Sequence, residues 1–161
     1  SSLFRVTFLQ GFSVNLNMNI FFEGPVLWSQ IDANMHLRHS AYADFAAQAR
    51  LSLLEQVGLT AVQFIQQQLG PILFREELFY HREISPNDKV RVSCEMTRCR
   101  PDGSRWSIKH EIFRGDGTKS ATILVDGAWI DTRKRKLTGL PPELMEKFKA
   151  IPRSEDFVEE A

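Results

Sequence analysis

The spacing of apolar residues separates one helical region from a later stranded region. Between residues 41 and 57, apolar side chains recur every three or four positions, which is the spacing of one buried helical face. The residues on this face are Tyr42, Phe45, Ala46, Ala49, Leu53 and Val57. The pattern predicts a long helix that begins after Ser40, a favourable N-cap, and ends at Gly58. A second, short helix is expected over residues 60–69, where Gly70-Pro71 ends it.

Beyond Pro71 the apolar period changes from 3.6 to 2, the period of strands with one buried and one wet face. Clusters of Ser, Pro, Asn, Asp and Gly separate the alternating segments and indicate turns. The predicted strands cover residues 72–84, 90–96, 106–112 and 121–129. Strand-forming residues also fill 20–31, with Gly24-Pro25 as an expected bulge or edge irregularity. Pro142 opens a short C-terminal helix that runs through Phe148.

The predicted order is therefore a strand, a long helix and four antiparallel strands. A single helix with so much apolar surface must pack across the concave side of a curled sheet, because nothing else in the chain covers it. We expect an α+β fold with one five-stranded sheet around one helix. The expected domain covers residues 20–150, after an N-terminal extension over 1–19 and before an acidic tail over 151–161 that is expected to be mobile after Ser154.

Composition narrows the class of protein. Hydrophobic residues make up 43% and charged residues 25% of the 161 residues, as in a typical globular domain. The 20 Lys and Arg balance 20 Asp and Glu, which argues against a binder of nucleic acid or anionic membranes. No apolar stretch is long enough to span a bilayer. The two cysteines form no CxxC pair and no disulfide scaffold, so a cytoplasmic location is expected.

The residue types that carry chemistry gather between residues 28 and 50. Asp32 follows the first predicted strand, and His39 and Ser40 open the long helix, whose first backbone N–H groups lie at the positive end of its dipole. Such N–H groups stabilise the oxyanion that forms when a carbonyl is attacked. The alternative is that Asp32 only accepts hydrogen bonds from its own loop and that His39 packs or faces solvent.

The run D-A-N-M-H-L-R-H-S-A-Y resembles the signature of the hot-dog-fold acyl-CoA thioesterases of the 4-hydroxybenzoyl-CoA thioesterase type. That signature has an Asp, a Gly-containing loop, an Asn or His seven residues later, a Tyr, and an Ala-Arg pair on the helix. Here these positions hold Asp32, His39, Tyr42 and Ala49-Arg50. The resemblance covers residues 20–132. Met35 stands where the family has Gly, and Arg38 and His39 stand where many members have two Asn residues.

The resemblance implies a hot-dog fold and hydrolysis of a thioester carried by CoA or acyl carrier protein, without a cofactor. Asp32 would act as general base or nucleophile, and His39 would orient the water or tune Asp32. Trp28, Tyr42 and Ser40 are expected to contact the substrate. The family also implies a homodimer or a dimer of dimers with sites at the subunit interface.

Three alternatives remain beside this interpretation. A metal site of Asp32, His36 and His39 lacks an H-E-x-x-H or cysteine set, so no metal is expected. A hot-dog hydratase would carry D-x-N-P-x-H, whereas this chain lacks the Pro and has its His one residue early. A non-catalytic acyl-binding protein is the third alternative. A serine hydrolase is disfavoured because the chain has no G-x-S-x-G elbow.

Overall fold

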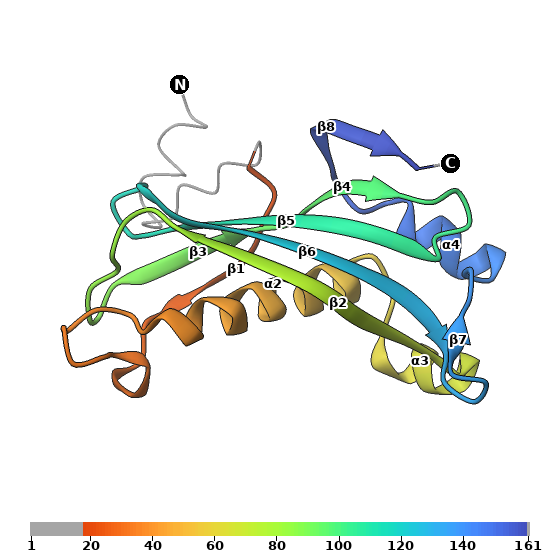
Figure 1. The fold of residues 1–161 in the computed structure, drawn as a ribbon, viewed down its shortest axis with the longest axis horizontal. Coiled ribbons are helices and arrows are strands. Elements are labelled where there is room, and N and C mark those ends of the chain that lie inside the picture. Colours follow the sequence, from red (N-terminus) through yellow and green to blue (C-terminus); the bar gives the residue numbers. More distant parts are fainter. Residues whose placement is uncertain (1–17, 161) are drawn as a thin grey trace, which may run out of the picture.

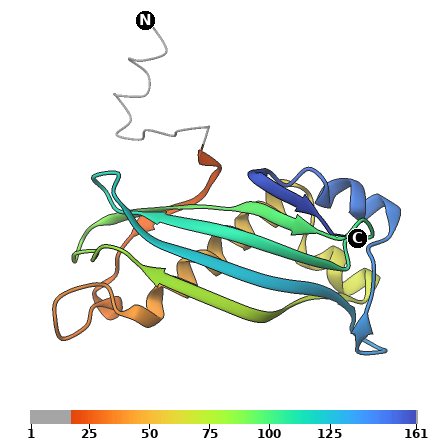
Figure 2. The same ribbon diagram turned by 45° about the horizontal axis from the view of Figure 1, so that its top comes forward.

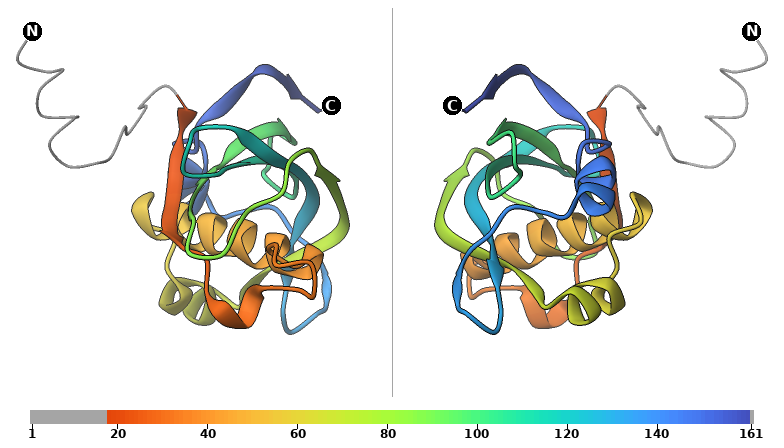
Figure 3. Two further views of the ribbon diagram at one scale, coloured as in Figure 1. Left: turned by 90° about the vertical axis from the view of Figure 1, so that its left-hand side faces the viewer. Right: turned by 90° about the vertical axis from the view of Figure 1, so that its right-hand side faces the viewer.

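One long helix, α2 (Tyr42–Gln56), is wrapped by a curled and mainly antiparallel sheet in the computed structural model of this protein (Figure 1). The structure describes residues 18–160, so most of the expected N-terminal extension lies outside the described residues. The end-on views of Figure 3 show the sheet arching over α2 from β1 (Ile20–Pro25) to β2 (Leu69–Tyr80). The expected α+β hot-dog architecture is confirmed.

The sheet contains every strand that the sequence predicts. β2 pairs with β6 (Lys119–Asp131), β6 with β5 (Arg105–Phe113), β5 with β3 (Lys89–Ser93) and β4 (Glu95–Cys99), and β1 with β3. Figure 2 shows β2, β6 and β5 running side by side across α2. The expected strand over 90–96 is divided into β3 and β4 at Cys94, whose N–H donates to the Asn19 carbonyl oxygen instead. The expected count of five strands was too low, because β7 (Lys136–Leu137) and β8 (Arg153–Glu159) extend the sheet.

The apolar face of α2 packs against the concave face of the sheet, as its spacing predicts. The buried residues of this face are Tyr42, Phe45, Ala46, Ala49 and Leu53. Burying a side chain the size of Leu53 contributes roughly 1.5–3 kcal/mol to folding. Gly58 follows the helix at a φ of 88°, a left-handed conformation that glycine adopts without strain.

The start of α2 differs from the prediction. A short 3-10 helix, η3 (His39–Ala41), precedes it, so Ser40 does not cap the helix. The Ser40 hydroxyl oxygen instead accepts a hydrogen bond from Arg38 Nε at 3.0 Å.

Two short helices cover one end of the sheet, the right-hand end in Figure 1. They are α3 (Ala61–Gln67) and α4 (Pro142–Phe148), close to the ranges that the sequence predicts. α3 begins with a capping box, in which the Thr60 hydroxyl oxygen accepts from Gln63 N–H at 3.4 Å. None of the helices formed by residues 18–160 is both long and apolar enough to cross a membrane.

Two further expectations are corrected. β1 ends at Pro25 rather than near Ile31, since proline has no N–H for the ladder, and a 3-10 turn, η2 (Trp28–Gln30), follows. The tail expected to be mobile after Ser154 instead forms β8, which pairs in parallel with β4. This pairing satisfies backbone groups on the outer edge of β4 that would otherwise lack partners.

Candidate active site

Asp32 opens a tight turn that precedes the helix. Its N–H donates to the His36 carbonyl oxygen at 2.8 Å, and its carbonyl oxygen accepts from Met35 N–H at 3.0 Å. Its side-chain Oδ1 accepts from the N–H groups of Asn34 at 2.9 Å and His36 at 3.2 Å. Asp32 therefore does accept hydrogen bonds from its own loop, as the alternative role requires. These bonds use only one of its two carboxylate oxygens. No hydrogen bond reaches Oδ2 from residues 18–160, so this oxygen is available to water or a substrate.

Met35 adopts a left-handed backbone conformation, with φ at 60°. A non-glycine residue in this region carries a cost of roughly 1–2 kcal/mol, because Cβ approaches the following carbonyl oxygen. The position where the family signature has glycine is therefore one where the backbone of this chain also favours glycine. The loop forms nonetheless with methionine, whose side chain is half exposed.

The loop is fixed at its far end by Arg38 and Leu37. The Arg38 N–H donates to the Gln30 carbonyl oxygen at 2.7 Å, and its guanidinium donates to the Ser29 carbonyl oxygen. The Leu37 N–H donates to the Ile84 carbonyl oxygen at 2.8 Å. Arg38, a departure from the family pattern, therefore joins the loop to η2. These bonds hold Asp32 in place relative to the start of the helix.

Tyr42 and Tyr80 line the space next to Asp32. Their rings meet edge to face with centroids 5.1 Å apart, and Tyr80 Oη donates to the His39 carbonyl oxygen at 3.1 Å. Burial, and then the neighbouring Tyr80 and Asp32, raise the pKa of Tyr42, so its hydroxyl stays protonated. The N–H groups of His39 and Ser40 open η3 and, as first residues of a helix, have no acceptor inside it.

Asp32, His39, Tyr42 and Tyr80 line a cavity of about 310 Å³, here named the Asp32 cavity. Its lining residues are Asp32, His36, Leu37, His39, Tyr42, Tyr80, His81, Arg82 and Glu83. The structure thus brings together three of the five predicted site residues. It does not bring Trp28 or the Ser40 side chain to the cavity. Trp28 lies on η2 with 76% of its surface exposed, and Ser40 is also exposed.

Several residues of the Asp32 cavity were not predicted as site residues. His36 was considered only as a metal ligand. Residues 80–83 lie inside the predicted strand over 72–84, whose composition gives no sign of a site, whereas the observed β2 ends at Tyr80. The end of β2 lies near the start of the helix only in the folded chain. The spacing of residues along the sequence cannot predict this contact. Among residues 18–160, no three His, Cys, Asp or Glu side chains are grouped as metal ligands.

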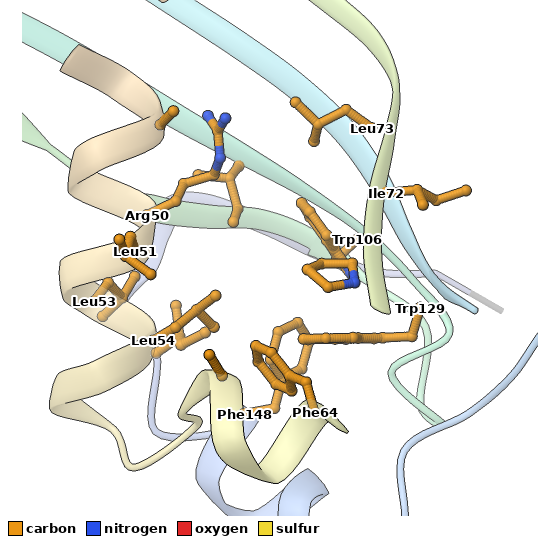
Figure 4. A pocket seen from close by; sticks show the side chains of 15 residues that line it. Arg50, Leu51, Leu53, Leu54, Phe64, Ile72, Leu73, Trp106, Trp129 and Phe148 are labelled. Carbon is orange, nitrogen blue, oxygen red and sulfur yellow. The ribbon is translucent and has the colours of Figure 1, made fainter. Parts of the chain in front are cut away.

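A second cavity of about 360 Å³, here named the Arg50 cavity, lies along the C-terminal half of α2 (Figure 4). It is bounded by α2, α3, α4 and strands β2, β5 and β6. Its lining residues are Ala47, Arg50, Leu51, Leu53, Leu54, Ala61, Phe64, Pro71, Ile72, Leu73, Trp106, Ile108, Trp129, Phe148 and Ile151. Among these lining residues, Leu53 lies on the predicted buried face of the helix, and Ile72, Trp106 and Trp129 lie in predicted strands. Arg50 is the one charged residue in the set.

Arg50 reaches a buried histidine behind the Arg50 cavity. Its Nη1 lies 3.0 Å from His110 Nε2, and His110 Nδ1 lies 2.9 Å from the Ser93 carbonyl oxygen. A guanidinium only donates and a carbonyl only accepts, so both bonds require a neutral imidazole with its proton on Nδ1. Burial, reinforced by the Arg50 charge, lowers the pKa of His110 from 6.5 to about 3. The neighbouring Cys94 is fully buried, which raises the pKa of its thiol to about 12.

Comparison with known proteins agrees with this architecture. Residues 26–148 match the family described as the thioesterase-like superfamily. No curated protein sequence matches the chain significantly.

Solved structures share the fold at low sequence identity. A DHNA-CoA thioesterase from Staphylococcus aureus is 21% identical, with a TM-score of 0.74 over 81% of this chain and 88% of its own. A 1,4-dihydroxy-2-naphthoyl-CoA thioesterase from Synechocystis is 16% identical, with a TM-score of 0.72 over 82% and 97%. A hypothetical protein from Staphylococcus aureus, in complex with CoA, is 18% identical, with a TM-score of 0.75 over 86% and 92%.

Proposed function

Because the chain belongs to the thioesterase-like superfamily, we propose that it hydrolyses acyl-CoA thioesters to a free acid and CoA, with Asp32 as general base or nucleophile. The observation that carries this proposal is the convergence of Asp32, His39 and the start of the helix on one cavity. The names of two structural neighbours, both CoA thioesterases, support the substrate class, as does the neighbour in complex with CoA.

The free Oδ2 of Asp32 gives the proposed mechanism its reactive atom. As a general base it takes a proton from a water, whose oxygen attacks the thioester carbonyl. As a nucleophile it attacks the carbonyl itself and forms a mixed anhydride that water then hydrolyses. In either route the C–S bond breaks, and the thiolate of CoA leaves and takes up a proton. A thiolate is a good leaving group, so little acid assistance is needed.

Backbone N–H groups complete the proposed site. The N–H groups of His39 and Ser40 would donate to the carbonyl oxygen as negative charge develops on it, aided by the positive end of the helix dipole. The His39 side chain would orient the attacking water. All groups that the proposed mechanism uses belong to the chain, and the mechanism includes no cofactor.

Strand β2 supports the predicted assembly into a homodimer. Among the described strands β2 pairs only with β6, so its other edge is open along a 12-residue strand. Three large apolar residues near its middle and end, Phe74, Phe79 and Tyr80, are 55%, 45% and 51% exposed. Long apolar edges of this kind are normally covered or paired. We therefore propose a two-fold dimer through β2, and light scattering that shows a monomer at micromolar concentration would contradict it.

The decisive experiment for the activity measures CoA release from a panel of acyl-CoA thioesters with a thiol-reactive dye. The panel contains short and long aliphatic, aromatic and unsaturated acyl groups, and enoyl-CoA absorbance is followed in parallel. Release of CoA supports the thioesterase. Loss of enoyl absorbance without CoA release would indicate the hydratase alternative, and acyl-CoA binding without either change would indicate a non-catalytic protein.

A further inference from the structure

Arg50 places a positive charge beside the apolar Arg50 cavity and forms no ion pair with an acid among residues 18–160. Among residues 18–160, no carboxylate oxygen lies within the 4.0 Å of an ion pair with Arg50. The acid whose charge acts on it is Glu76 on β2, beyond ion-pair distance and exposed to solvent. Its hydrogen-bond partner is the neutral His110. A partly buried cation beside an apolar cavity is costly unless an anion accompanies it.

The other polar side-chain atoms of the residues that line the Arg50 cavity are also donors. The indole Nε1 atoms of Trp106 and Trp129 are buried and have no acceptor among the described residues. A buried donor without a partner costs roughly 1–3 kcal/mol. Among residues 18–160, the lining side chains of the Arg50 cavity thus offer donors and no acceptor, and the two indole N–H groups are covered by protein atoms. A ligand that brings a carboxylate to the charged end satisfies the guanidinium.

The shape of the Arg50 cavity separates its charged part from an aromatic part. In Figure 4, Arg50 rises from α2 at the end of the cavity away from Phe64 and Phe148. The ring of Trp129 lies 5.1 Å from that of Phe64 and 5.7 Å from that of Phe148. The cavity volume of about 360 Å³ falls within the range of about 300–1,000 Å³ usual for small-molecule sites.

We propose that the Arg50 cavity binds an apolar carboxylate, with the carboxylate on the Arg50 guanidinium and the apolar body against Phe64, Trp129 and Phe148. The carboxylate supplies the missing negative charge and the acceptor oxygens, and the body fills the aromatic part. Two sources of this chemistry exist if the proposed thioesterase function holds. One is the free acid product, and the other is the distal carboxylate of a dicarboxylic acyl-CoA.

Tryptophan fluorescence tests the binding independently of any turnover, because Trp106 and Trp129 line the cavity. Titration with decanoate should change the emission at a concentration at least about tenfold lower than with decanol, since a charge-assisted hydrogen bond contributes roughly 1.5–3 kcal/mol. Arg50→Met should abolish this preference, and Arg50→Lys should retain part of it. Arg133→Met, which removes an exposed arginine from the turn between β6 and β7, is the matched control and should bind like the parent protein.

The outcomes decide the proposal even if Arg50→Met fails to fold. Equal affinity of the parent protein for decanoate and decanol, or no binding of either, overturns it. Retention of the decanoate preference in a folded Arg50→Met variant also overturns it. Binding of decanoate through Arg50 in a protein that releases no CoA from any thioester would remove the proposed function and keep this ligand assignment.

Kinetics then distinguish the two sources. If the carboxylate is that of the product, decanoate inhibits hydrolysis of decanoyl-CoA, and Arg50→Met relieves the inhibition. If it is the distal carboxylate of the substrate, the mono-CoA thioester of decanedioic acid has the higher kcat/KM, and Arg50→Met reverses the ranking. If an Arg50→Met variant folds and hydrolyses decanoyl-CoA but shows neither of these effects, a carboxylate role for Arg50 is overturned.

Discussion

The two cavities lie toward opposite ends of α2 and differ in almost every physical respect. The Asp32 cavity is lined mainly by ionisable side chains from a loop, a helix start and the end of β2. The Arg50 cavity is lined by apolar side chains from helices and strands, with one cation among them. The first places reactive groups next to helix N–H donors, and the second surrounds an apolar body. A single helix therefore connects a place suited to reaction with a place suited to recognition.

This difference explains which cavity the sequence revealed. The groups of the Asp32 cavity that matter most are within eight residues of one another, so local spacing exposes them. The Arg50 cavity is formed by side chains from six elements that are far apart in the sequence. Within each element, the apolar residues resemble those of an ordinary core. Four experiments test whether reaction and recognition are divided between the cavities in this way.

Asp32→Asn makes the sharpest test of the Asp32 cavity. The asparagine carbonyl can still accept from Asn34 and His36, so the loop should keep its shape while the basic oxygen is lost. We expect kcat to fall by on the order of a hundredfold or more, with acyl-CoA binding retained. Asp44→Asn, at an exposed position in the first turn of α2, is the control and should turn over normally. Near-normal turnover in Asp32→Asn would remove the carboxylate from the mechanism.

The buried His110, which is hydrogen-bonded to Arg50, makes the free energy of unfolding depend on pH. The folded-state pKa of about 3 is below the ordinary 6.5, so the unfolded chain binds a proton that the folded chain excludes. The stabilising effect of neutral His110 is complete above about pH 6.5 and is lost as pH falls toward 3. Between pH 6.5 and 5 the loss should be about 2 kcal/mol, from 1.36 kcal/mol per pH unit.

Comparison with His110→Gln isolates this contribution from that of other groups. The difference in unfolding free energy between the two proteins, measured by denaturant titration, should shrink over that pH range. A difference that stays constant from pH 7 to 5 would contradict a neutral buried histidine.

His39→Ala tests whether the imidazole or only the backbone at that position serves the reaction. The backbone N–H groups remain, so kcat/KM should fall by about tenfold, less than in Asp32→Asn. If the imidazole is a bystander, the change should be limited to a few tenths of a kcal/mol in stability. Steady-state kinetics and melting temperature of this one variant decide between the two roles.

Met35→Gly makes the smallest change and tests the backbone of the Asp32 loop. Glycine adopts a φ of 60° without strain, so the unfolding free energy should rise by about 1 kcal/mol, less the added entropy of the unfolded chain. Ala33→Gly, at an exposed loop position outside the left-handed region, is the control and should destabilise slightly. A lower melting temperature for Met35→Gly than for Ala33→Gly would contradict strain at this position.

The fold was largely predictable because its periods are long and regular. Alternation over residues 106–112 and 121–129, and the three- and four-residue spacing of the helix, follow directly from burial on one face. The end of β1 was less predictable, because Gly24 and Pro25 interrupt a segment that is otherwise rich in strand formers. β8 was missed because its charged residues resemble those of a solvated tail, and its pairing with β4 depends on a distant edge.

The candidate site was predictable only where its parts are close in the sequence. The positions of Asp32 and His39 before the helix made them candidates, and the resemblance to the family signature added Tyr42 and the site roles. The structure places all three on one cavity. Tyr80 was not found, since its contacts with Tyr42 and His39 join residues about forty positions apart. Ser40 was predicted as the helix N-cap from its residue type. Its hydroxyl oxygen instead accepts a hydrogen bond from the Arg38 guanidinium.

The parallel pairing of β8 with β4 has a consequence for handling the protein. Met96 N–H donates to the Pro152 carbonyl oxygen at 2.8 Å, and Glu160 N–H donates to the Cys99 carbonyl oxygen at 2.9 Å. A chain shortened before Pro152 would lose both bonds and leave β4 as an unprotected border of the sheet, next to the buried Met96 and Cys99. Removal of an acidic tail looks harmless, but this truncation would favour self-association in concentrated solution.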